Sequence, residues 1–208
     1  MNLPRTGLVA ILRGLGPQEA PEVGQRLYEA GFRALEVPLN SPDALASIRL
    51  LREGLPDDCA VGAGTVLTVE EVRAARDAGA GIIVSPAMDP EVITTTVRLG
   101  MRSYPGVATP TEAFAAVRAG ARSLKLFPAD AVGIGGMKAW QAVLPTGIEF
   151  IPVGGVDAGN LGDWVTAGAT GAGIGSSLYR PGITGHDLSA RAAALVRAWQ
   201  SATDRQEH

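Results

Sequence analysis

The sequence is poor in cysteine, histidine and lysine, and each scarcity disfavours a class of chemistry. The single cysteine, Cys59, cannot form a disulfide within the chain, so nothing favours an oxidising compartment. The two histidines, His186 and His208, are too few for a histidine-rich metal site, and they leave most Ser-His triads incomplete. Lys125 and Lys138 are the only lysines, because arginine supplies nearly all the positive charge.

The chain also lacks a strong charge bias and a long apolar run. Its formal net charge is −3, and 19% of its residues are charged. Without a basic patch we expect no nucleic-acid partner. No run approaches the roughly 18 apolar residues of a membrane span, and residues 1–7 lack a signal-peptide pattern. We therefore expect a soluble, cytoplasmic protein of one domain, a size that 208 residues suit.

What the sequence does contain is a regular alternation of short apolar runs and longer segments of helical periodicity. The predicted strands are residues 8–13, 34–39, 60–66, 81–86, 102–107, 123–127, 150–153 and 171–174. The predicted helices include residues 20–30, 42–52, 69–78, 90–99, 110–119 and 186–200. Such alternation predicts parallel strands joined by crossover helices.

Residues at the ends of the predicted helices support this interpretation. Helix starts are indicated by Ser41-Pro42, Asp89-Pro90 and Thr109-Pro110, and capping boxes by Thr68 with Glu71 and Thr109 with Glu112. Glycines follow the helices at intervals of about 20 to 24 residues, the length of one compact strand–helix unit.

Eight such units predict a single (β/α)₈ TIM barrel across residues 1–208, with residues 201–208 as a frayed tail. The alternative is a doubly wound open sheet. It is disfavoured because Gly14-Leu15-Gly16 is followed by Pro17 and not by a dinucleotide fingerprint.

Three predicted strands carry a charged residue that hydrophobic burial would not select: Arg13, Glu36 and Lys125. Desolvation would lower the lysine pKa and make its amine nucleophilic near neutral pH. By our count Glu36 lies on the second strand and Lys125 on the sixth, and even-numbered strands share interior layers of a barrel. The pair suits proton transfer at a covalent site, although a structural ion pair would also satisfy both charges.

Further polar or small residues lie at the ends of other predicted strands. Arg13 could hold a planar carboxylate through two hydrogen bonds or could form a salt bridge. Thr65 adds a hydroxyl, and its flanking glycines could simply let strands pack closely. Gly154-Gly155 and Gly175-Ser176 end the last two strands. Backbone N–H groups of these loops could bind phosphate, or the glycines could only form tight turns.

Five motifs resemble, in order and in register, those of the 2-keto-3-deoxy-6-phosphogluconate and 6-phosphogalactonate aldolases. They are LVAILRG at 8–14, LEVPLNSP at 35–42, GAGTV at 62–66, LKLFPA at 124–129 and PVGGV at 152–156. The resemblance implies a class I aldolase with a Schiff base on Lys125 and Glu36 as the acid/base. It further implies a phosphorylated sugar acid as substrate, pyruvate and glyceraldehyde 3-phosphate as products, no metal, no cofactor and a homotrimer.

Two positions resemble the galactonate branch of that family. Asn40 stands where the gluconate enzymes usually carry arginine, and Val153 where they usually carry threonine. The first difference moves carboxylate binding to Arg13 and Thr65, with Asn40 beside them. The second removes a hydroxyl near C4 and should alter the preferred epimer, so the 6-phosphogalactonate substrate is favoured over its gluconate epimer.

Three other functions remain open from the residues alone. A phosphate-binding barrel isomerase or epimerase would use Glu36 to abstract a proton without cleaving a carbon–carbon bond. A class I aldolase for an unphosphorylated 4-hydroxy-2-oxo acid would not be inhibited by inorganic phosphate. A non-catalytic sugar-phosphate-binding barrel would release no pyruvate, and the pairing of Lys125 with Glu36 speaks against it.

Overall fold

The computed structural model describes residues 6–205, in which strands and helices alternate along the chain. The strands are β1 (Gly7–Ile11), β2 (Ala34–Pro38), β3 (Ala60–Gly64), β4 (Ile82–Val84), β5 (Arg102–Tyr104), β6 (Gly106–Val107), β7 (Ser123–Leu126), β8 (Glu149–Pro152) and β9 (Gly171–Ile174). The helices are α1 (Ala20–Ala30), α2 (Ala44–Gly54), α3 (Val69–Asp77), α4 (Pro90–Arg98), α5 (Pro110–Arg118), α6 (Ala129–Gln141), α7 (Leu161–Thr166) and α8 (Gly185–Asp204). The predicted α/β fold with parallel strands is confirmed.

The strands form two parallel sheets, with the orders β5-β4-β3-β2-β1-β9 and β6-β7-β8. We expected one strand over 102–107, but it is divided at Pro105, which has no N–H to donate to a ladder. Its first part pairs with β4 and its second with β7. On the other side, a single bridge between Val153 and Gly173 joins β8 to β9.

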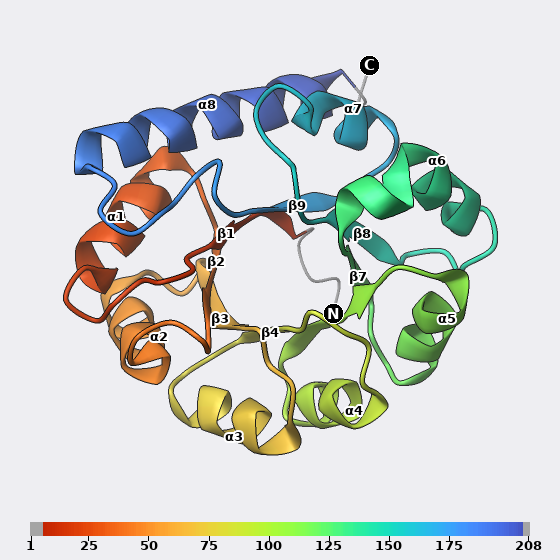
Figure 1. Cartoon of the computed structure of the whole chain (residues 1–208), viewed down its shortest axis with the longest axis horizontal. Coiled ribbons are helices and arrows are strands. Elements are labelled where there is room, and N and C mark those ends of the chain that lie inside the picture. The colour runs from red at the N-terminus through yellow and green to blue at the C-terminus, as the bar shows by residue number, and fades with distance from the viewer. Residues whose placement is uncertain (1–5, 206–208) are drawn as a thin grey trace.

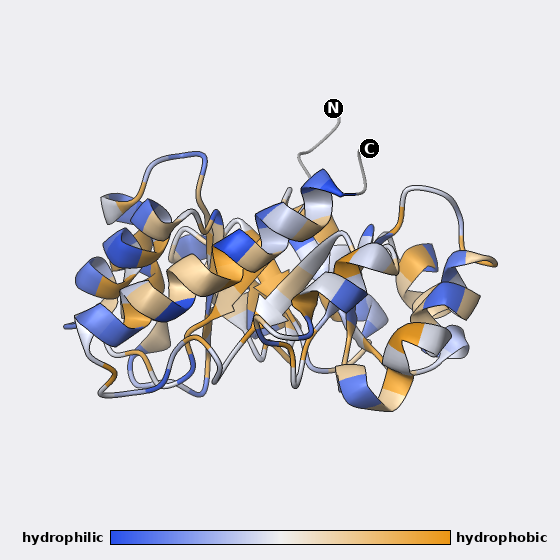
Figure 2. Cartoon of the chain, turned by 90° about the horizontal axis from the view of Figure 1, so that it is seen from above, coloured by the Kyte–Doolittle hydropathy of each residue, from blue (hydrophilic) through white to orange (hydrophobic). Residues whose placement is uncertain are grey.

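The strands curl around a common centre, and the helices lie outside them (Figure 1). Side chains alternate along each strand, so one set faces the helices and the other faces the centre. The outer set packs with the apolar faces of the helices, whose opposite faces carry hydrophilic residues (Figure 2). The inner set is a separate apolar cluster formed by Val9, Ile11, Ala34, Ile82, Val84, Tyr104, Ile151 and Val153. A polar group that lies within this cluster is therefore surrounded mainly by hydrocarbon.

Most of the predicted helix starts are confirmed. Thr68 and Thr109 form capping boxes with Glu71 and Glu112, and the Asp89 carboxylate accepts the first N–H groups of α4. The cap predicted at Ser41-Pro42 is wrong. Helix α2 begins two residues later, because Ser41 is buried and its hydroxyl instead accepts the Gly14 N–H at 2.9 Å.

Two helices had no predicted bounds, and one is longer than expected. Helix α6 contains three glycines and is interrupted at Gly133, whose φ is 67°, while α7 has only six residues; neither gives a clear periodicity. Helix α8 continues to Asp204, so the tail predicted from Ser201 is wrong for its first four residues, because Ala202 is buried. Residues 1–5 and 206–208 lie outside the described residues. They include part of the segment 1–7, which lacks a signal-peptide pattern, and the last part of the predicted frayed tail. Within 6–205, no helix combines the length and hydropathy needed to cross a membrane.

Candidate active site

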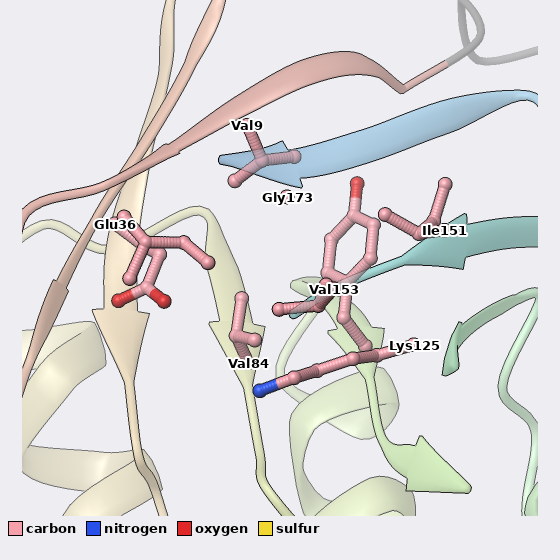
Figure 3. Close-up of a pocket in the computed structure, with 9 residues that line it drawn as sticks. Val9, Glu36, Val84, Lys125, Ile151, Val153 and Gly173 are labelled. Atoms are coloured by element: carbon pink, nitrogen blue, oxygen red, sulfur yellow. The ribbon is translucent and has the colours of Figure 1, made fainter. Parts of the chain in front are cut away.

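Glu36 and Lys125 extend from β2 and β7 into one pocket at the centre of the strands (Figure 3). Both side chains point inward because each alternates with outward-facing leucine or valine residues on its strand. The rest of the pocket wall is almost entirely apolar: Val9, Ile11, Val84, Tyr104, Ile151, Val153 and Gly173. An amine and a carboxyl group are thus held together in a hydrocarbon-lined space.

The Glu36 carboxyl group is buried and incompletely bonded. Glu36 is 3% exposed, and its Oε2 atom has no hydrogen-bond partner. A Cβ atom at Gly64 would overlap this carboxyl group, so the glycine leaves the space that the carboxyl group occupies. Burial raises the Glu36 pKa from 4.5 to about 7, against the opposing effect of the positive charges of Lys125 and Arg13. Glu36 can therefore hold or release a proton near neutral pH.

The Lys125 amine is buried to a similar degree. Lys125 is 7% exposed, and its Nζ atom lies 4.4 Å from the centre of the Phe127 ring. Desolvation lowers its pKa, the Glu36 carboxylate raises it, and Arg13 lowers it. The ion pairs formed within residues 6–205 do not include one between Lys125 and Glu36. The structural ion pair that the sequence left open is therefore not formed.

This arrangement has a definite chemical capability. A desolvated amine is in its neutral, nucleophilic form for a larger fraction of time than an ordinary lysine. A carboxyl group that titrates near neutral pH can act as base in one step and as acid in the next. The two groups together can form a covalent bond to a carbonyl carbon and move the accompanying protons.

Arg13 and Asn40 lie outside the pocket lining, beyond the carboxyl ends of β1 and β2. Both are exposed, and Arg13 Nη1 donates to Asn40 Oδ1 at 2.8 Å. Thr65 directly follows Gly64 at the end of β3, is partly buried, and has a left-handed φ of 58°. Because φ values of this kind are costly for a threonine, its backbone is held in a conformation that an unconstrained chain would avoid.

The two glycine loops follow β8 and β9, as the sequence predicts. Gly154 and Gly155 have left-handed φ values of 105° and 69°. The Ser177 hydroxyl links the loops by donating to the Val156 carbonyl at 2.9 Å. Across residues 6–205, the N–H groups of Gly154, Gly155, Gly175 and Ser176 donate to no protein acceptor. These donors are available to an anion, although α8 begins only at Gly185 and the loop after β9 is followed first by a single turn.

The structure thus brings three of the predicted residues, Lys125, Glu36 and Val153, into the pocket, and the other seven do not line it. Sequence reasoning missed Tyr104, which is 2% exposed and forms part of the wall. Its position two residues after Arg102, on the same face of β5, was the available signal. The sequence analysis also assigned Gly62 and Gly64 a single role, close packing of the strands. Gly62 does allow close packing on the Ile82 backbone, whereas Gly64 makes room for Glu36.

Known proteins are similar to this chain in both sequence and fold. The family model described as KDPG and KHG aldolase matches residues 2–193. A probable 2-dehydro-3-deoxy-6-phosphogalactonate aldolase from Rhizobium meliloti (strain 1021) is 47% identical, over 93% of this chain and 92% of its own. The 2-dehydro-3-deoxy-6-phosphogalactonate aldolase of Escherichia coli (strain K12) is 46% identical, over 94% and 95%.

A solved structure described as native KDPGal has the same fold. Its TM-score is 0.92 and its identity 45%, over 98% of both chains. The sequence motifs, the buried amine and carboxyl pair and these similarities agree, and the chain belongs to the KDPG and KHG aldolase family of carbon–carbon lyases.

Proposed function

We propose that this protein is a class I aldolase that cleaves 2-dehydro-3-deoxy-6-phosphogalactonate to pyruvate and glyceraldehyde 3-phosphate. The observation that carries the proposal is the buried Lys125 amine, which faces Glu36 in one apolar pocket without forming an ion pair. Relatives that are 46% and 47% identical over more than nine-tenths of the chain carry the name of this activity.

In the first half of the reaction, the neutral Lys125 amine attacks the C2 carbonyl carbon of the substrate. The carbonyl oxygen takes up protons and leaves as water, so a protonated imine joins C2 to Nζ. The apolar wall supports this step because desolvation favours the neutral amine before attack. Glu36 is the group in the pocket wall whose pKa lies near neutral pH, so it can supply and remove these protons.

In the second half, Glu36 removes the proton of the C4 hydroxyl and the C3–C4 bond breaks. The bonding electrons move into the imine and give a neutral enamine, while C4 leaves as the aldehyde of glyceraldehyde 3-phosphate. Glu36 then returns a proton to C3, and water releases pyruvate from Lys125. One carboxyl group can serve both transfers because its raised pKa lies near neutral pH.

The two ends of the substrate would be held by the residues at the rim. Arg13 and Thr65 are proposed to bind the carboxylate, with Asn40 beside them, because Arg13 is an exposed cation beside the ends of β1 and β2. Gly154, Gly155, Gly175 and Ser176 are proposed to bind the 6-phosphate through N–H groups that donate to no acceptor within residues 6–205. Binding at both ends would fix the C3–C4 bond beside Lys125.

Val153 supports the galactonate epimer as the substrate. Its side chain is apolar and lies in the pocket wall with Lys125 and Glu36, so it offers no hydrogen bond to a hydroxyl group. Comparing kcat/KM for the 6-phosphogalactonate and 6-phosphogluconate substrates measures this preference directly.

Incubation with pyruvate and borohydride, followed by peptide mass analysis, tests the function. We expect a reduced adduct on the peptide that contains Lys125, because borohydride traps an imine as a stable amine. Lys138 is the internal control, since it is the only other lysine and is exposed on α6. An active, folded sample without an adduct on Lys125 would replace the aldolase scheme with an isomerase or epimerase.

We also infer that the two sheets make one closed (β/α)₈ barrel and a single domain spanning the chain. The inference is supported by the bridge between Val153 and Gly173 and by the pairing of Gly106 with Lys125 immediately after Pro105. A homotrimer and a cytoplasmic location stay predictions from the family resemblance and the composition. Sedimentation and cell fractionation measure them.

A further inference from the structure

Two hydrogen bonds join the loops that follow β1 and β2. Arg13 Nη1 donates to Asn40 Oδ1 at 2.8 Å, and the Gly14 N–H donates to Ser41 Oγ at 2.9 Å. The second bond fixes the backbone next to Arg13, since Ser41 is buried. A Cβ atom at Gly14 would also overlap Pro181, so the loop after β9 closes on the same point. The base of the Arg13 side chain is therefore fixed on two sides, and Asn40 holds its exposed end.

The partner of the guanidinium is neutral. None of the ion pairs within residues 6–205 includes Arg13. An amide oxygen can accept a hydrogen bond from the guanidinium without cancelling its charge, whereas a carboxylate at position 40 would neutralise it. The remaining guanidinium N–H groups can still receive a carboxylate from solution.

We infer that Asn40 is a positioning residue that acts through Arg13: it holds the guanidinium at the rim of the pocket without contributing its own bond to the substrate. The inference rests on the proposed function, in which Arg13 binds the carboxylate of the keto acid. Asn40 keeps the Arg13 side chain in one of its many rotamers before substrate arrives. Loss of this restraint weakens binding more than it slows the chemical steps.

The position of Arg13 also has an electrostatic consequence inside the pocket. The titratable groups that line or face the pocket are Glu36 on β2, Lys125 on β7, Tyr104 on β5 and Arg13 itself. The Arg13 charge lowers the pKa of both Glu36 and Lys125. When the guanidinium moves away from the rim, both pKa values rise. A role of Asn40 in packing alone would not move them in this way.

A double-mutant cycle tests the inference with Arg13→Gln, Asn40→Leu and the combined variant. Leucine has nearly the size of asparagine but cannot accept the Arg13 hydrogen bond. We expect Asn40→Leu to raise KM for the keto acid by about three- to tenfold, the worth of one hydrogen bond, with little change in kcat. In the Arg13→Gln background, Asn40→Leu should have no further effect. Additive effects on KM would overturn the inference and assign Asn40 a direct contact with substrate.

A second measurement needs no substrate. Competitive acetylation with acetic anhydride across a pH series reports the pKa of each lysine, and the two lysines lie on separable peptides. Asn40→Leu should raise the Lys125 pKa in the same direction as Arg13→Gln, while Lys138 on α6 stays unchanged as the matched control. An unchanged Lys125 pKa in Asn40→Leu, with a raised one in Arg13→Gln, would overturn the inference. Failure of the proposed function is recognised separately, by wild-type protein that forms no adduct with pyruvate.

Discussion

The charged side chains at the two ends of the space enclosed by the strands differ in how fully they are hydrogen-bonded. At the amino ends of the strands lies a hydrogen-bonded group, which we call the Glu149 network; it consists of Arg102, Glu149, Thr6 and Ser123. The Glu149 carboxylate accepts from Arg102 at 3.0 Å, from Thr6 at 2.7 Å and from Ser123 at 2.5 Å. Toward the carboxyl ends, Glu36 leaves Oε2 without a partner. The Glu149 carboxylate is thus satisfied by hydrogen bonds, whereas the Glu36 carboxyl group keeps an oxygen atom available for reaction.

Strand β7 contributes to both ends. Ser123 and Lys125 are two residues apart on its inner face, yet Ser123 donates to Glu149 while Lys125 forms no ion pair within residues 6–205. The Tyr104 hydroxyl adjoins the network at 3.1 Å from Thr6 Oγ1, and its ring lines the pocket. Because the single Thr6 hydroxyl proton is donated to Glu149, the tyrosine is the donor in this bond. The bonded end is built to stabilise the fold, and the unbonded end to react.

The largest effect is expected when the reactive end loses its amine. Lys125→Met should reduce kcat at least about 10³-fold, because no imine can form. Its melting temperature should equal or exceed that of the wild type, because a desolvated amine is replaced by an apolar chain of similar length. Pyruvate release and thermal unfolding measure the two effects. Substantial remaining activity would rule out covalent catalysis by Lys125.

An intermediate effect is expected at the bonded end. Glu149→Gln removes the negative charge facing Arg102, whose side chain is 24% exposed. We expect a loss of about 1–3 kcal/mol in the free energy of unfolding, below the cost of breaking a fully buried pair because solvent screens this one in part. Urea unfolding measures the loss.

The matched control for this variant is Glu22→Gln, which breaks the exposed pair with Arg26 on α1. Surface pairs of this kind contribute little, so its unfolding free energy should change by less than about 0.5 kcal/mol. Equal effects of Glu149→Gln and Glu22→Gln would remove the distinction between a network inside the fold and a surface pair.

The last effect is a dependence of stability on pH. Folding raises the Glu36 pKa from 4.5 to about 7, so between these values the folded protein holds a proton that the unfolded chain has lost. Wild-type stability from this group is therefore fully present below pH 4.5 and falls as pH rises toward 7. Glu36→Gln cannot lose a proton, and one pKa unit corresponds to about 1.4 kcal/mol, so it should gain about 3 kcal/mol relative to wild type across this window. Urea unfolding of both proteins at several pH values measures the difference, and a constant difference would contradict the raised pKa.

Patterns that span only a few residues predicted much of the fold and part of the site. Short apolar runs located β1, β2 and β7, and the count of strands placed Glu36 and Lys125 in shared interior layers. Capping chemistry located the starts of α3, α4 and α5, since a cap depends on residues within one turn. The cap predicted at Ser41 failed because a distant partner, Gly14, takes its hydroxyl.

The sequence by itself determined the order of strands and helices, the inward direction of Lys125 and Glu36, and the family, because these depend on local periodicity and ordered motifs. Only the tertiary structure decided which charges are paired. Glu149 and Arg102 are 47 residues apart and bond to each other, while Glu36 and Lys125 line one pocket without an ion pair within the described chain. Whether two charges meet depends on the distance between strands far apart in sequence and on the dielectric around them. Neither quantity is encoded in a short stretch of residues.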